Sequence, residues 1–299
     1  MVSSSNAAHE AQLEGVLTPM AVEADESGRA HYRLQLGGQT LPLNHWLGAT
    51  LSLSATGDIQ CLNCGTATLE SFGRGYCRRC FFSLARCDFC MVSPERCHYF
   101  EGTCREPQWG ERFCFSPHLV YLANASAPKV GITRAGNLPG RWLNQGASQG
   151  LAILEVASRR QAGFVEALFR EQISDRTSWQ RMLKGPPAPV DLVALRECLF
   201  ERLAAGLEAL HQHFGAGSVT PCAGARPFAF EYPALAWPER VRARNLDREA
   251  SIEGRLMAIK GQYLLLDSGV INLRKYAGYG IRLRLASGAE AAPGQRALL

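Results

Sequence analysis

The stretch that decides the fold runs from His118 to Arg134 and reads HLVYLANASAPKVGITR. Two short apolar runs, at residues 119–122 and 130–133, flank a loop of small residues that contains Pro128. Both runs are rich in β-branched or aromatic residues, and such runs on either side of a short loop are typical of a β-hairpin. The stretch therefore predicts two antiparallel strands.

The residues after this hairpin predict a helix, a third strand and a second helix. Pro139 suits the first turn of a short helix that runs to about residue 147. Residues 151–156 read LAILEV and predict a strand. Residues 160–174 predict a longer helix, because apolar side chains recur on one face at Phe164, Val165, Leu168, Phe169 and Ile173. The expected order is strand, strand, helix, strand, helix.

This order, with the residues it carries, resembles the GIY-YIG endonuclease superfamily over about residues 118–184. Tyr121 falls where the first family motif has its tyrosine. Lys129-Val130-Gly131 falls where the second motif belongs, with lysine in place of the tyrosine, as in some members. Arg141 occupies the place of the catalytic arginine and Glu166 that of the metal-binding glutamate. The resemblance implies a nuclease module with these residues in its site.

The resemblance also implies a role for each residue. Glu166 would hold Mg²⁺, and Arg141 would bind the phosphate oxygens. Tyr121 would orient or deprotonate the attacking water, with its pKa lowered by Lys129. The alternatives are structural: a core tyrosine, a strand-end lysine, a helix-surface arginine, and a glutamate paired with Arg170 one helical turn away.

The late polar residue that the superfamily also uses has two candidates here, Asp175 and Asn144. No Walker loop, serine nucleophile elbow or dinucleotide fingerprint is present to compete for the active site. We therefore expect no organic cofactor.

The cysteines gather in one segment, where nine of the eleven lie between Cys61 and Cys114. Two Cys-x-x-Cys pairs, Cys61 with Cys64 and Cys77 with Cys80, are separated by twelve residues. Each pair can present both sulfurs to one tetrahedral ion, and two pairs complete four ligands. The spacing predicts a structural zinc ribbon, because four protein ligands leave no open coordination position. A redox role for one pair is the alternative.

A further set of donors follows the ribbon. Cys87 and Cys90 form a third pair, which we expect Cys104 and Cys114 to complete as a second zinc site. Spacing alone leaves alternatives open, because Cys97 and His98 are also donors and the pairs can interleave between two ions. About two zinc ions per chain are expected.

The flanking regions are predicted to be richer in β-structure. Residues 1–60 alternate in short runs punctuated by turns, which predicts a small antiparallel β module. Residues 186–299 predict one helix from about Asp191 to Phe214, with a leucine stripe, and then a β-rich tail that we hypothesise pairs with the N-terminal strands. Residues 61–117 and 118–185 are the zinc-binding and nuclease-like segments. The predicted class is α+β, with four segments.

Composition and charge narrow the functional classes. The chain is 46% hydrophobic and 20% charged, as in soluble globular proteins, and no apolar run reaches the roughly 20 residues that span a bilayer. No secretory signal is visible, so a cytoplasmic location and no membrane partner are expected. Residues 111–185 hold ten basic and five acidic residues. That excess suits a nucleic-acid partner, although a solvated helix face is the alternative.

We therefore expect a zinc-containing, Mg²⁺-dependent endonuclease of GIY-YIG type acting on DNA or RNA. Two other functions stay open: a nucleic-acid-binding protein with a degenerate nuclease module, and a protein-interaction scaffold built on the zinc modules. The arrangement of segments also resembles a bacterial and archaeal domain-of-unknown-function family over most of the chain.

Overall fold

Strands from both ends of the chain form one antiparallel sheet in the computed structural model, which describes residues 10–215 and 217–287. The strand order is β1 (Glu10–Val16), β14 (Tyr279–Ala286), β5 (Thr50–Ile59), β11 (Ile252–Lys260), β12 (Tyr263–Leu266), β13 (Gly269–Asn272). Leu283 on β14 lies opposite Leu13 on one side and Leu53 on the other. The hypothesised pairing of the N-terminal strands with the tail is therefore confirmed.

The β domain is built from two similar halves that exchange strands. In the first half, β4 leads through a 3₁₀ helix and Gly48 into β5, and in the second half β13 leads through a 3₁₀ helix and Gly278 into β14. Both glycines have positive φ, +84° and +90°, which only glycine adopts readily. The last strand of each half pairs with the first strand of the other. A separate three-stranded sheet completes the domain. Its strands, in order, are β2 (Ala21–Ala24), β3 (Ala30–Leu36), β4 (Gln39–Pro42).

A second large sheet carries the nuclease-like segment. Its strands are β10 (Phe228–Ala229), β8 (Gln149–Val156), β6 (His118–Asn124), β7 (Pro128–Arg134), with β9 (Val219–Pro221) also paired to β8. Helix α3 (Gly140–Asn144) precedes β8, and α4 (Arg159–Phe169) follows it. The predicted order of elements is confirmed. Helix α4 ends about five residues earlier than predicted, because the chain turns after Phe169.

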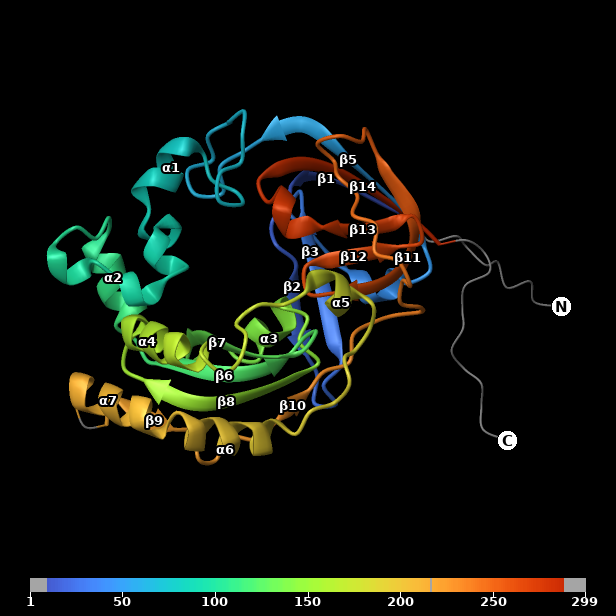
Figure 1. Cartoon of the computed structure of the whole chain (residues 1–299). Helices are drawn as coiled ribbons and strands as arrows, with labels where there is room; N and C mark the ends of the chain where they lie inside the picture. The colour runs from blue at the N-terminus through green and yellow to red at the C-terminus, as the bar shows by residue number, and fades with distance from the viewer. Residues whose placement is uncertain (1–9, 216, 288–299) are drawn as a thin grey trace, which may run out of the picture.

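The two faces of this sheet pack into different cores. Val120 and Leu122 on β6 belong to a core cluster with apolar residues of α4, α6 (Leu192–Arg202) and α7 (Ala204–Phe214). Tyr121 and Ala123 belong to the larger cluster shared with the β domain, α3 and α5 (Trp179–Leu183). Figure 1 shows α3 and α5 between the sheet and the β domain, with α6 and α7 running along the outer side of β8. Residues on opposite faces of β6 thus contact different parts of the chain.

The single helix predicted over residues 191–214 is wrong, because the chain breaks at Leu203 into α6 and α7. The predicted leucine stripe is nevertheless packed against the core. After the break, α7 approaches α4 so closely that a Cβ at Gly206 would lie 2.6 Å from Leu168 Cδ1. Among the described residues, no helix has both the length and the apolar character that a bilayer-spanning segment needs.

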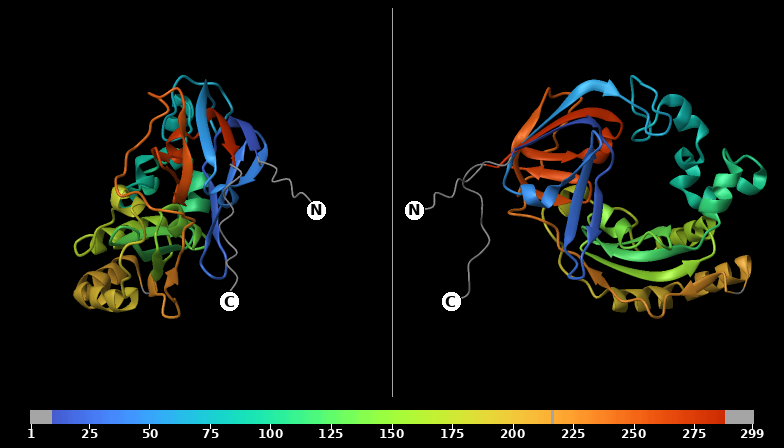
Figure 2. Two further views of the ribbon diagram at one scale, coloured as in Figure 1. Left: turned by 90° about the vertical axis from the view of Figure 1, so that its right-hand side faces the viewer. Right: turned by 180° about the vertical axis from the view of Figure 1, so that it is seen from behind.

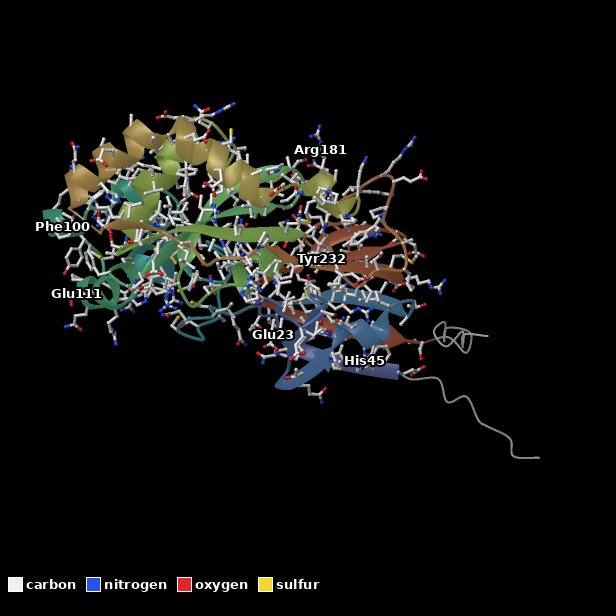
Figure 3. All side chains as sticks on the ribbon, turned by 90° about the horizontal axis from the view of Figure 1, so that it is seen from below. Glu23, His45, Phe100, Glu111, Arg181 and Tyr232 are labelled. Carbon is white, nitrogen blue, oxygen red and sulfur yellow. The ribbon has the colours of Figure 1, made fainter. Side chains whose placement is uncertain are left out.

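The cysteine-rich segment connects β5 to β6 as an arch of short helices. It contains α1 (Arg78–Ser83), four 3₁₀ turns and α2 (Pro107–Cys114). Figures 1 and 2 show it leaving the β domain, passing over the α3 and α4 side of the second sheet, and rejoining at β6. Seen from below, Phe100 and Glu111 of this segment lie at the end of the molecule opposite His45 of the β domain (Figure 3).

The β domain is tied to the second sheet by polar contacts at the end of α3. Gln262 donates from Nε2 to Asn144 Oδ1 at 2.7 Å and to the Met20 carbonyl at 2.9 Å. The Tyr232 hydroxyl donates to the Ala147 carbonyl at 2.8 Å. These buried bonds fix α3 relative to the β domain, so the two parts share one core.

The interleaved sheet predicts a large cost for a substitution near the C-terminus. Leu283 is fully buried between strands from the start of the chain. We expect Leu283→Ala to lower the free energy of unfolding by about 2–5 kcal/mol in urea denaturation. Leu69→Ala is the control, since Leu69 is 97% exposed, and its effect should stay within about 0.5 kcal/mol. Equal effects would contradict the interleaved core.

Candidate active site and metal centre

Tyr121 occupies a place on the central strand that requires a glycine opposite it. In the β6–β7 register Tyr121 faces Gly131. A Cβ at Gly131 would lie 2.6 Å from both Cζ and Oη of the phenol, closer than any side chain can approach. The ring therefore lies over the glycine, where no larger residue would fit without displacing it.

Helix α3 brings an arginine to the same phenol. Trp142 is 1% exposed and lies edge-on to the Tyr121 ring, with centroids 6.0 Å apart. Trp142 also packs on Gly150 of β8, where a Cβ would overlap the indole. With the helix fixed in this way, Arg141 Nε donates to Tyr121 Oη at 3.3 Å, and Tyr121 donates to Gln145 Oε1 at 3.2 Å. Gln145 was not predicted, although it follows Arg141 by one helical turn.

Glu166 is half-buried on α4 and does not form the ion pair with Arg170 that was the structural alternative to a metal-binding role. Arg170 instead approaches Glu95 and Asp175, each at 3.7 Å. Within residues 10–215 and 217–287, the Glu166 carboxylate has no hydrogen-bond or ion-pair partner. Burial raises its pKa, against the opposing charge of Arg170. A half-buried carboxylate with a raised pKa and no partner is a candidate functional group.

Lys129 and Asp175 complete the constellation. Lys129 is 6% exposed, and burial lowers its pKa to about 8, with Arg141 adding to the effect while Glu166 and Asp175 oppose it. Arg141 and Glu166 are therefore close enough to act on the charge of Lys129, and Arg141 also contacts Tyr121. Of the two late polar candidates, Asp175 joins them.

Asn144, the other late polar candidate, lies elsewhere. Its side chain donates to the Gly140 carbonyl and accepts from Gln262 at the β-domain junction. Both bonds hold α3 in place, so this residue supports the helix rather than the constellation.

The expectation that Lys129 lowers the pKa of Tyr121 is wrong. The phenol is fully buried, and burial raises its pKa even though Arg141 opposes the shift. The cation that touches Tyr121 is Arg141, whereas Lys129 is not among the groups that act on it most strongly. Tyr121 is therefore protonated at neutral pH and serves as a hydrogen-bonding group.

Arg159, which the sequence did not single out, lies between Glu166 and the second group of cysteines. It donates from Nη2 to the Met91 carbonyl at 2.6 Å. Burial lowers its pKa, while the nearby charges of Cys114, Cys90 and Glu166 favour its protonated form. Arg159 is the first residue of α4, and no motif or spacing in the sequence set it apart from the other basic residues.

The four ribbon cysteines form one cluster. The sulfurs of Cys61, Cys64, Cys77 and Cys80 all lie within 4.8 Å of one another. Cys64 Sγ and Cys77 Sγ are 3.8 Å apart, which is about the separation that 2.3 Å bonds to a tetrahedral zinc ion would give. The donor set therefore fits structural zinc.

Hydrogen bonds favour the thiolate form at two of the four cysteines, Cys61 and Cys64, whereas the pKa of Cys80 is raised to about 12. The Thr66 hydroxyl and backbone amide lower the pKa of Cys64 to about 6. Burial opposes ionisation of Cys61, but backbone amides of Cys77, Cys64 and Asn63 lower its pKa. Amides that point at sulfur stabilise the charged ligand that zinc requires.

The remaining cysteines separate into two places. Cys90, Cys104 and Cys114 line one small cavity together with Cys97. Cys87, expected among them, instead packs beside the core of Cys61, Cys80 and Leu84. His98 lies near Cys90 and Asp88, with ligand atoms within 4.8 Å of one another.

Comparison with known proteins identifies the family but no activity. A family model described as a protein of unknown function (DUF2797) matches residues 48–281, so the chain belongs to that family. No curated protein and no solved structure matches the chain.

Because the Tyr121 ring touches Gly131, we expect that adding even one methyl group at Gly131 will lower the free energy of unfolding. Gly131→Ala would displace the ring and its bond to Arg141, so we expect a loss of about 1–3 kcal/mol in the free energy of unfolding. Gly136→Ala is the matched control, since nothing lies within 4 Å of a Cβ there. Similar urea midpoints for the two variants would contradict the close contact.

The ribbon cluster predicts one zinc ion whose loss destabilises the protein. We expect Cys64→Ser to bind one zinc ion fewer per chain than wild type by metal analysis, with a lower thermal midpoint, because metal binding and folding are coupled. The exposed Cys198 on α6 provides the control: Cys198→Ser should keep the wild-type metal content. Unchanged zinc in Cys64→Ser would exclude this residue as a ligand.

Proposed function

We propose that this DUF2797 protein is a divalent-metal-dependent nucleic-acid phosphodiesterase of the GIY-YIG type. One observation carries the proposal. The half-buried, unpaired carboxylate of Glu166 lies within electrostatic reach of Arg141 and Lys129, and Arg141 is held by Tyr121. Phosphodiester cleavage needs a metal ligand and cations that neutralise the phosphate at one point, and this constellation supplies both.

Each side chain has a role that follows from its surroundings. Glu166 holds Mg²⁺ with Asp175 nearby, which suits an ion that takes one or two carboxylates and keeps several waters. When bound, the ion supplies positive charge against the phosphate and the leaving oxygen. Arg141 uses Nε for Tyr121, and its terminal nitrogens, which have no hydrogen-bond partner among the described residues, bind the non-bridging oxygens.

Tyr121 and Lys129 are buried, and they support the side chains that would bind the metal ion and the phosphate. The buried phenol fixes the plane of the Arg141 guanidinium and is a positioning residue, because its raised pKa disfavours a role as base. Lys129 adds a second positive charge where the phosphate would lie, and it favours the ionised form of Glu166.

The exposed basic residues after α4 support a nucleic-acid substrate. Part of the basic excess in this segment is internal, since Lys129 is buried and Arg159 is bonded to Met91. The exposed remainder includes Arg176, Arg181 and Lys184. These side chains border α5 and would contact the phosphate backbone beside the site.

The full burial of Tyr121 favours a second candidate function, binding of nucleic acid without cleavage. A site whose tyrosine reaches no solvent could keep the architecture of a nuclease while cutting nothing. The exposed arginines would then supply the affinity, and the Tyr121–Arg141 pair would be structural.

A cleavage assay tests the proposal. Purified protein with Mg²⁺ should cut labelled DNA or RNA, and Glu166→Gln should reduce the rate by about 10²-fold or more. Glu171→Gln, a substitution at an exposed position just beyond the end of α4, should cut like wild type. Equal rates for Glu166→Gln and wild type would overturn the enzyme assignment.

A binding assay separates the second candidate from the first. In fluorescence anisotropy, affinity should fall by about 0.9 log unit per log unit of salt for each duplex phosphate neutralised. The double variant Arg176→Ala and Arg181→Ala should weaken binding and flatten this slope. Salt-dependent binding without cleavage would favour the second candidate, and absence of both would exclude the nucleic-acid partner.

A further inference from the structure

Four cysteines outside the ribbon line one small cavity, although their four sulfurs do not all lie within 4.8 Å of one another as those of the ribbon do. The cavity has a volume of about 20 Å³, which is about the space that one water molecule fills. Its lining includes Cys90, Cys97, Cys104 and Cys114.

Asp88 and His98, which lie close to Cys90, are already engaged with other groups. Asp88 is 4% exposed, accepts from the Phe89 amide at 2.6 Å, and pairs with Arg105 at 2.8 Å. His98 contacts Asp88 at 3.3 Å through Nε2 and Thr103 at 2.6 Å through Nδ1. Both carboxylate oxygens of Asp88 and both ring nitrogens of His98 therefore have protein partners, although these two residues and Cys90 also place ligand atoms within 4.8 Å of one another.

The segment that carries these cysteines has no apolar core to hold it. No residue between 88 and 117 belongs to a core cluster of the described residues. Phe89, Val92 and Phe100 are 48%, 85% and 70% exposed. The described cysteines are all free thiols, so no disulfide closes these turns. Short segments of this kind usually need a metal ion to fix their fold.

We propose that Cys90, Cys97, Cys104 and Cys114 bind a second structural zinc ion, with Cys97 as the fourth ligand in place of Cys87. Four thiolates are a common closed donor set for structural zinc. Arg159 is close enough to Cys114 and Cys90 to interact with their charges, so its positive charge would offset part of the negative charge of a zinc tetrathiolate. This site does not depend on whether the protein cleaves nucleic acid.

The second ion also fixes the helix that carries Glu166. The turn Pro94–Arg96, between two of the ligands, packs on α4 so closely that a Cβ at Gly163 would lie 2.5 Å from the Glu95 amide. Arg159 donates to the Met91 carbonyl, and Arg170 approaches Glu95 at 3.7 Å. Zinc at the four cysteines therefore holds the turns against which α4 is seated.

Zinc content of matched variants tests this ligand set. Wild type should hold two zinc ions per chain by metal analysis of the full-length protein, and Cys97→Ser and Cys114→Ser should each hold one. Cys87→Ser, which removes a neighbouring thiol outside the cavity, should hold two, as should His98→Gln. Two ions in Cys97→Ser with one in Cys87→Ser would overturn the assignment.

Cobalt substitution of the wild-type chain decides the question where a variant fails to fold. Two Co²⁺ ions per chain with thiolate charge-transfer absorbance about twice that of a single tetrathiolate site would support the second site. One ion per chain, or a second ion whose spectrum reports nitrogen or oxygen ligands, would overturn it. Neither readout uses cleavage activity, so failure here is distinguishable from failure of the proposed function.

Discussion

The contact between the Tyr121 ring and Gly131 is the constraint on which the rest of the constellation depends. It exists because facing residues on two antiparallel strands share one side of the sheet, and glycine leaves room for the ring. The ring meets Trp142, which anchors α3, and its hydroxyl meets Arg141. One cross-strand contact therefore sets the positions of a strand, a helix and a guanidinium.

Burial then decides what each polar group can do. It keeps the phenol of Tyr121 protonated and lowers the pKa of Lys129 to about 8, so neither group behaves as it would in water. Glu166 differs, because the arginine expected to neutralise it is engaged with Glu95 and Asp175. The site thus combines rigidly held, buried polar groups with one carboxylate that has no partner. This arrangement is typical of functional sites and uncommon in ordinary cores.

The sequence predicted what depends on local pattern and missed what depends on distant contacts. Strand and helix periodicity located β6 to α4, and the Cys-x-x-Cys pairs located the ribbon cluster. The choice of Cys87 as a ligand rested on spacing alone, which cannot reveal that Cys87 packs beside Cys61, Cys80 and Leu84 while Cys97 lines the cavity. Arg159 and Gln145 were missed because their partners come from other elements. The helix break at Leu203 depends on α7 approaching Leu168 of α4, a contact that leucine periodicity does not encode.

The β domain and the cysteine-rich arch are stabilised by different kinds of interaction. The two halves of the β domain exchange strands, so residues as far apart as Leu13 and Leu283 stabilise each other. The arch between β5 and β6 has almost no apolar core, since its only cluster is Cys61, Cys80 and Leu84 with their neighbours. A segment that buries little apolar surface must be held by stronger local bonds, which metal–thiolate ligation provides. Because this arch is seated on α4 through Gly163, the position of the helix that carries Glu166 depends on turns more than fifty residues earlier in the chain.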